Sequence, residues 1–267
     1  MITMSQPEQT SQPEETSQPE ATSPPETTGN PLATPAIEHE HPDVTGGWLR
    51  PAVFGAMDGL VSNAALIAGV AGGTRDAADS KVIVLAGLAG LAAGAFSMAA
   101  GEYASVASQS EAAEHEIAKE RQEIIDNPAG ETAELAEMFV GKGIDRELAR
   151  EMAEQVHRDL DNAVTVHSVE ELGVDPDELA SPMLAAVSSF ISFAIGAFVP
   201  VLPYLFGAEH LAPAIVLTLV ALFACGAVVT RVTSRPWWYG GLRLILLGGV
   251  AFSLTYVVGM AVGAGLA

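Results

Sequence analysis

The chain has 267 residues, of which 49% are hydrophobic, yet its formal net charge is -21. Those values do not fit one compact soluble domain, so we expect apolar and acidic residues to occupy separate segments. The acidic balance argues against nucleic acid as a partner and favours cations. The single cysteine excludes an intramolecular disulfide and a cysteine-based metal cluster.

Residues 1–45 are rich in Pro, Glu, Ser, Thr and Gln and contain a degenerate short repeat. So few apolar side chains cannot offset the entropy lost on ordering, which predicts a disordered acidic tail. A basic stretch followed by an apolar one is missing, so the segment is not interpreted as a signal peptide.

Five apolar runs follow the tail, and each is close to the ~20 residues that a helix needs to cross a bilayer. They cover residues 51–73, 82–100, 182–206, 211–229 and 242–266. Glycines recur within them at four-residue spacing, which allows close helix packing: Gly55/Gly59, Gly90/Gly94 and Gly259/Gly263. The runs predict five transmembrane helices.

The basic residues predict the orientation of these spans. With the N-terminus inside, ten Lys and Arg residues fall inside and two outside, and the opposite orientation reverses that count. The tail and residues 104–181 are then cytoplasmic, and the C-terminus faces out. No organelle signal is apparent, so we expect the plasma membrane of a bacterium.

Residues 102–181 form a second polar region with 21 acidic and six basic side chains. No Gly or Pro interrupts residues 102–127, so the second span should continue as one long helix until Pro128 and Gly130. Shorter helices are expected at 131–140, at 145–159 with Asp145 as N-cap, and near 163–172 before Gly173.

The predicted fold is therefore an all-α membrane protein with five transmembrane helices. A cytoplasmic metal-binding domain of three to four helices is inserted between the second and third. The predicted divisions are the tail at 1–45, the first two spans at 46–103, the insertion at 104–181, and the last three spans at 182–267.

Asp58 lies about two turns into the first span, where a carboxylate is costly and usually faces a cavity or a partner. The alternative is a structural acid paired with a polar group of another helix. Met98 offers a soft thioether for a transition metal, and Glu102 follows it by four residues on the same helical face. Asn63 adds a further candidate oxygen, so these four residues are the predicted translocation pathway.

The insertion offers a second set of candidate ligands at helical spacing. They are Glu116, Glu120 and Glu123 on the long helix, Glu131 and Glu134 on the next, and His167 and Glu171 on the last. Packed together, such carboxylates and one imidazole suit a divalent metal. A solvated acidic face explains any single Glu equally well.

Glu154 and His157 form one Glu-x-x-His unit. Di-iron carboxylate bundles use that unit twice, with two further glutamates. A surface histidine is therefore favoured over an oxidase centre, no catalytic residue is predicted, and the chain is not expected to be an enzyme.

The stretches DGLVSNAALIAGVAG, SMAAGEYASVASQSEAAEHEIAKERQEI and SFAIGAFVPVLPYLF resemble the vacuolar iron transporter family, here as a bacterial-type member. The resemblance covers about residues 45–267. It implies a homodimer that exchanges Fe²⁺ for protons and moves iron out of the cytosol. It implies translocation through Asp58 and Met98. It also implies metal binding by Glu120, Glu123, Glu131, Glu134 and Glu171.

Two positions depart from the family pattern: Gly90 replaces a glutamate of the second span, and His167 replaces a methionine. Mn²⁺ therefore stays open beside Fe²⁺. The expected function is divalent metal/H⁺ antiport, with the bilayer, metal ions, protons and a second copy as partners and no prosthetic group. The alternative is a membrane-anchored metal buffer or sensor without transport.

Overall fold

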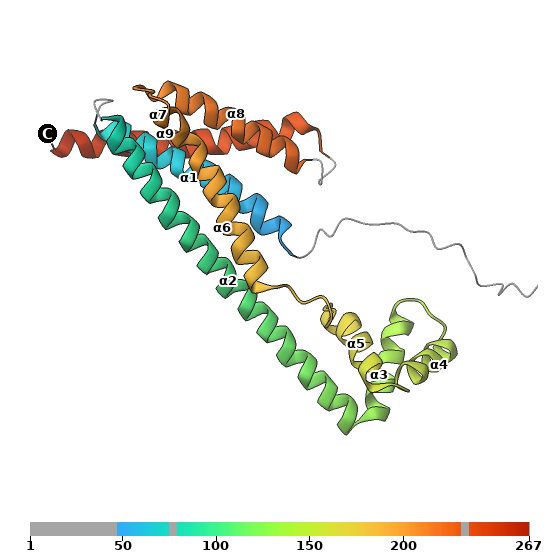
Figure 1. Cartoon of the computed structure of the whole chain (residues 1–267). Coiled ribbons are helices and arrows are strands. Elements are labelled where there is room, and N and C mark those ends of the chain that lie inside the picture. The colour runs from blue at the N-terminus through green and yellow to red at the C-terminus, as the bar shows by residue number, and fades with distance from the viewer. Residues whose placement is uncertain (1–46, 75–78, 231–234, 267) are drawn as a thin grey trace, which may run out of the picture. The chain divides into compact units, whose positions relative to one another are not determined.

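The computed structural model describes residues 47–74, 79–230 and 235–266. Over these residues the chain is helical and contains no strand. Figure 1 shows the order of the helices along the chain. The predicted disordered tail, residues 1–45, lies outside the described residues.

Five helices in the described part of the chain are long and apolar enough to cross a membrane, as predicted. They are α1 (Leu49–Gly73), α2 (Ser80–Asp126), the Pro182–Leu205 segment, α8 (Ala212–Val229) and α9 (Trp237–Leu266). Large apolar side chains on α9, such as Leu246 and Val250, are about 60% exposed, as expected for a surface in contact with lipid.

The third span is not one uninterrupted helix. It consists of α6 (Pro182–Phe198), a 3₁₀ turn (Val199–Val201) and the short α7 (Leu202–Leu205). Pro200 and Pro203 lack a backbone N–H, and the helix tightens where they occur.

Helix α1 packs closely against both α6 and α9, and glycines make this possible. A Cβ on Gly59 would lie 2.3 Å from the carbonyl oxygen of Phe193 in α6, and one on Gly263 would lie 2.0 Å from the carbonyl oxygen of Gly73. A Cβ on Gly94 would meet the Phe193 ring. The packing role predicted for the spaced glycines is confirmed.

Helix α2 continues for 47 residues, which confirms the predicted long helix. It ends at Asp126, and Asn127 caps α3 (Pro128–Gly141), which begins three residues earlier than predicted because Pro128 occupies its first turn. Gly130 lies inside α3 and is not a stop signal.

Two short helices and a π-helical turn complete the insertion. Asp145 caps α4 (Arg146–Val156) as predicted, but α4 ends three residues before the predicted end at Asp159. Asp159 instead caps a separate helix, α5 (Leu160–His167), by accepting a hydrogen bond from the Asn162 N–H. A π-helical turn (Ser168–Leu172) then ends at Gly173, whose φ of 69° suits glycine.

Small apolar clusters hold these helices together. Leu135 and Phe139 of α3 pack against Ala149 and Ala153 of α4. Ile124 of α2 packs against Ala163 and Val164 of α5, and this contact holds α5 beside the end of α2. An ion pair of 2.7 Å between Arg121 and Asp161 joins the same two helices.

Candidate functional site

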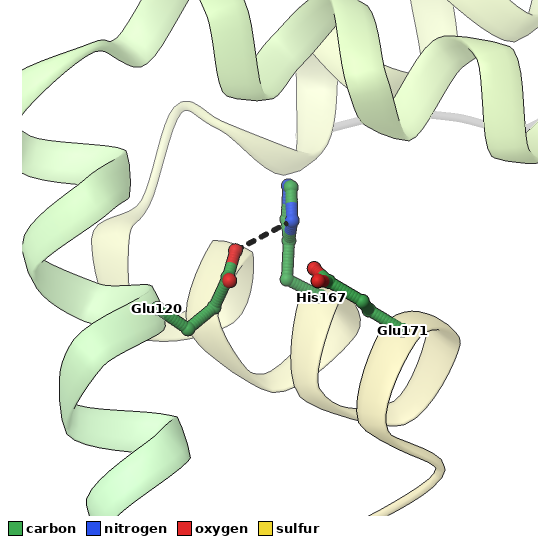
Figure 2. A group of neighbouring side chains, drawn as sticks. All are labelled: Glu120, His167 and Glu171. Atoms are coloured by element: carbon green, nitrogen blue, oxygen red, sulfur yellow. Dashed lines mark ion pairs between the residues drawn. The ribbon is translucent and has the colours of Figure 1, made fainter.

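A buried group of potential ligands lies where α2 meets α5 and the π-helical turn. One atom each from Glu120, His167 and Glu171 lies within 4.8 Å of the others. Glu120 Oε1 is 2.8 Å from His167 Nδ1, and Figure 2 shows the two side chains pointing toward each other with Glu171 beside them. Glu120 is 4% exposed and His167 is 0% exposed, whereas Glu171 is exposed.

Local structure explains why these three side chains converge. Apolar packing of Ile124 against α5 covers the face of α2 that carries Glu120. His167 is the last residue of α5, and Glu171 lies in the π-helical turn that follows. Such turns are rare and occur often at functional sites, because they change the direction of side chains within a helix.

The charges of this group perturb one another. Burial, followed by the charges of Glu171, Glu131 and Glu123, raises the pKa of Glu120 to about 7. Burial and then the nearby His157 lower the pKa of His167 to about 4. The imidazole is therefore neutral at pH 7 with a lone pair available, and the carboxylates repel one another in a way that a cation would relieve.

Other predicted ligands surround this group without joining its tightest part. Burial raises the pKa of Glu131, and the charges of Glu134 and Glu123 raise it further. These three carboxylates therefore lie close enough together to interact. Glu123 also pairs with Lys119 at 3.5 Å. Glu116 is exposed and belongs to no such group in the described part of the chain.

Sequence reasoning missed one residue of this region. His157, interpreted above as a surface histidine, is half-buried, and its ring lies 5.1 Å from that of His167 between centroids. Glu154, its partner in the Glu-x-x-His unit, pairs with Arg150 at 3.1 Å instead. Spacing along α4 carries no signal for the contact, because His167 comes from another helix.

Among the spans, the structure forms a cavity of about 490 Å³. Three of the four predicted pathway residues line it: Asp58 from α1 and Met98 and Glu102 from α2. Arg50, Ser97 and Gln109 add further polar groups to its wall. A carboxylate from each of two helices and a thioether thus face one space, which suits a divalent transition metal.

Asn63, the fourth predicted pathway residue, does not line this cavity. It is buried between helices, where its side-chain amide donates to the carbonyl oxygens of Gly87 in α2 at 3.1 Å and Ala197 in α6 at 2.5 Å. Its Oδ1 lies 2.8 Å from where a Cβ of Gly90 would be. In this structure Asn63 links three helices.

Gly90 occupies the position where the resemblance led us to expect a glutamate. A Cβ there would lie 2.4 Å from Leu66 Cδ2 as well as close to Asn63. The position faces α1 rather than the cavity that holds Asp58 and Met98. A longer side chain at this point would require the side chains of Leu66 and Asn63 to shift.

The fold and the cavity define an all-helical, multi-pass membrane protein with carboxylates among its spans. Comparison with known proteins places it more closely, since the model of the VIT family matches residues 49–260. The chain belongs to this family.

Relatives in three organisms share most of their length with this chain. "Vacuolar iron transporter" of Acanthamoeba castellanii is 34% identical over 84% of this chain and 84% of the relative. "VIT-like transporter 1b" of Glycine max is 33% identical over 81% of this chain and 77% of the relative. "Vacuolar iron transporter 1" of Oryza sativa subsp. japonica is 29% identical over 84% of this chain and 90% of the relative.

Proposed function

We propose that the protein is a divalent metal/H⁺ antiporter that carries Fe²⁺, with Mn²⁺ as the second candidate, out of the cytoplasm. Membership of the VIT family and relatives named vacuolar iron transporters support iron as the cargo. The observation that carries the proposal is the cavity that joins Asp58, Met98 and Glu102 among apolar helices. A membrane anchor alone would not need polar and soft ligands there.

The insertion would act as the cytoplasmic collector of metal ions. Its buried Glu120 and His167 lie on or beside the same helix that forms the cavity wall. Glu102 and Glu120 are 18 residues apart in α2, which is about five turns, so they lie on the same face, about 27 Å apart. Glu116 lies on that face between them. This exposed carboxylate would bind metal ions transiently on their way from Glu120 to Glu102.

Proton coupling follows from the chemistry of the ligands. A carboxylate must lose its proton to bind a metal ion, so protons and metal compete for Asp58 and Glu102. Protonation from the far side of the membrane would favour metal release there. Alternating access of the cavity to the two sides would then supply the direction of transport.

A second copy of the chain would cover the cavity. Asp58 is exposed in this single chain although it belongs to an apolar span. An ionisable side chain facing lipid is costly and is found instead against protein or a water-filled space. A homodimer with the cavity at its interface would remove that cost.

The deciding experiment measures metal flux in proteoliposomes under a pH gradient. We expect Fe²⁺ accumulation that requires the gradient, and a loss of at least tenfold in Asp58→Asn. Asp126→Asn, which neutralises an exposed carboxylate at the end of α2, is the matched control and should transport normally. Undiminished flux in Asp58→Asn would contradict the site. Metal binding without any accumulation would favour the membrane-anchored buffer instead.

A further inference from the structure

His157 is held in a position that leaves one ring nitrogen available. It caps the C-terminal end of α4, and its Nδ1 is 2.9 Å from the carbonyl oxygen of Ala153. Only a protonated nitrogen can donate to a carbonyl, so Nδ1 carries the proton and Nε2 carries the lone pair. This Nε2 is buried, and no hydrogen-bond partner contacts it among the described residues.

The neighbouring ring of His167 also carries a nitrogen without a hydrogen-bond partner among the described residues. Its side chain is completely buried, its Nδ1 faces Glu120, and its Nε2 also has no hydrogen-bond partner among the residues described. The two imidazole rings meet edge to face, with an interplanar angle of 86°. Buried polar atoms in proteins are nearly always paired, so two unpaired nitrogens on neighbouring rings, whose centroids are 5.1 Å apart, indicate a missing ligand.

Carboxylates complete the surroundings of the two rings. Glu120 and Glu171 offer oxygens within 4.8 Å of a nitrogen of His167. Glu131 lies close enough to His157 for the two side chains to interact electrostatically. Metal-bound histidines usually donate their other ring N–H to a backbone carbonyl or a carboxylate, which is the arrangement that Ala153 provides for His157.

We propose that His157 Nε2 is a metal ligand, so that the insertion holds a divalent ion with two imidazoles and carboxylates. The inference rests on the proposed function, in which the insertion collects metal ions. Nitrogen ligands strengthen binding of Fe²⁺, Co²⁺ and Zn²⁺ more than that of Mn²⁺, which prefers oxygen. His157 therefore makes the collector selective for iron-like ions over Mn²⁺.

The test compares Co²⁺ with Mn²⁺ on the full chain in detergent, because Co²⁺ is stable in air and reports its ligands. His157→Gln should weaken Co²⁺ binding at least tenfold and Mn²⁺ binding much less, so the ratio of the two affinities falls. His115→Gln removes an exposed histidine of α2 and should leave that ratio unchanged. An unchanged ratio in His157→Gln would overturn the role of His157 alone.

X-ray absorption of Co²⁺ on the unmodified chain gives a readout that does not depend on how a variant folds. Scattering from two imidazoles is expected in the wild type and from one in His157→Gln. A single imidazole in the wild type would contradict the inference while leaving the collector in place. A wild-type chain that binds neither ion would contradict the proposal that the insertion collects metal ions.

Discussion

At the scale of single residues, the raised pKa of Glu120 predicts how metal binding by the proposed collector depends on pH. Its pKa is raised to about 7 by burial and by the charges of Glu171, Glu131 and Glu123. Below pH 7 the group is protonated, and a metal ion must displace that proton. His167, with its pKa lowered to about 4, stays neutral over the same range and adds no pH dependence of its own.

We therefore predict that Co²⁺ affinity falls as the pH is lowered from 8 to 5.5, by roughly tenfold per unit below pH 7 for one displaced proton. Glu120→Gln should bind more weakly and show a flatter profile, whereas Glu114→Gln, at an exposed position, should keep the slope. Titration calorimetry in two buffers would count the released protons. Equal affinity at pH 6 and pH 8 would exclude this role for Glu120.

The raised pKa of Glu120 also predicts how the stability of the metal-free protein depends on pH. Because the folded chain holds this proton more tightly than the unfolded chain, whose ordinary value is 4.5, stability falls as the pH rises from 4.5 toward 7. Glu120→Gln should lift the melting temperature at pH 8 and leave it nearly unchanged at pH 4.5. A lower melting temperature at pH 8 would show that the carboxylate stabilises the apo fold.

A substitution of Asn63 tests whether this residue stabilises the helix packing or takes part in metal translocation. Its amide hydrogen bonds to α2 and α6 predict that Asn63→Ala lowers stability by about 1–2 kcal/mol. Flux per folded molecule should stay near the wild-type value, since the side chain does not line the cavity. Thr218→Val, which loses a hydrogen bond within α8 only, is the control. A tenfold loss of flux at normal stability would return Asn63 to the pathway.

At the scale of helices, the contact between α1 and α6 depends on the absence of side chains. Gly59 and Gly196 each approach the backbone of the opposite helix, to which an added Cβ would come within 2.3 Å. Atoms cannot be compressed to that distance, so the helices would have to move apart. That movement would also displace Asp58, which lies next to Gly59 in α1.

Gly59→Ala should accordingly destabilise the protein by about 1–3 kcal/mol through overpacking, read as a lower melting temperature in detergent. Gly249→Ala, in α9 with nothing within 4 Å of the added Cβ, is the matched control and should be neutral or slightly stabilising. Equal melting temperatures for the two variants would show that α1 and α6 can separate without cost.

At the scale of the whole molecule, the exposed Asp58 and the open cavity predict association of two copies. In a Cys225→Ser background, Ser97→Cys on the cavity wall should form a cross-linked dimer in liposomes. Leu247→Cys, which is 61% exposed on α9, should not. A monomeric mass in mild detergent, together with no cross-linking at Ser97→Cys, would oppose the dimer.

The sequence by itself determined the five apolar spans, the long second helix and the acidic insertion. Each of these depends on the composition and periodicity of a continuous stretch, such as the uninterrupted run through Glu102 to Asp126. The same local signals found Asp145 as an N-cap and Gly173 as a helix end. They also supplied the candidate ligands, because carboxylates at helical spacing are visible without a fold.

Only the tertiary structure decided which of those ligands are buried together. Glu120 is buried, whereas Glu116 on the same helix is exposed. The ring of His157 lies beside that of His167, which belongs to another helix. Asn63 does not line the cavity that contains Asp58. Burial and cross-helix distance arise from packing between segments far apart in the chain. No periodicity within one segment encodes them.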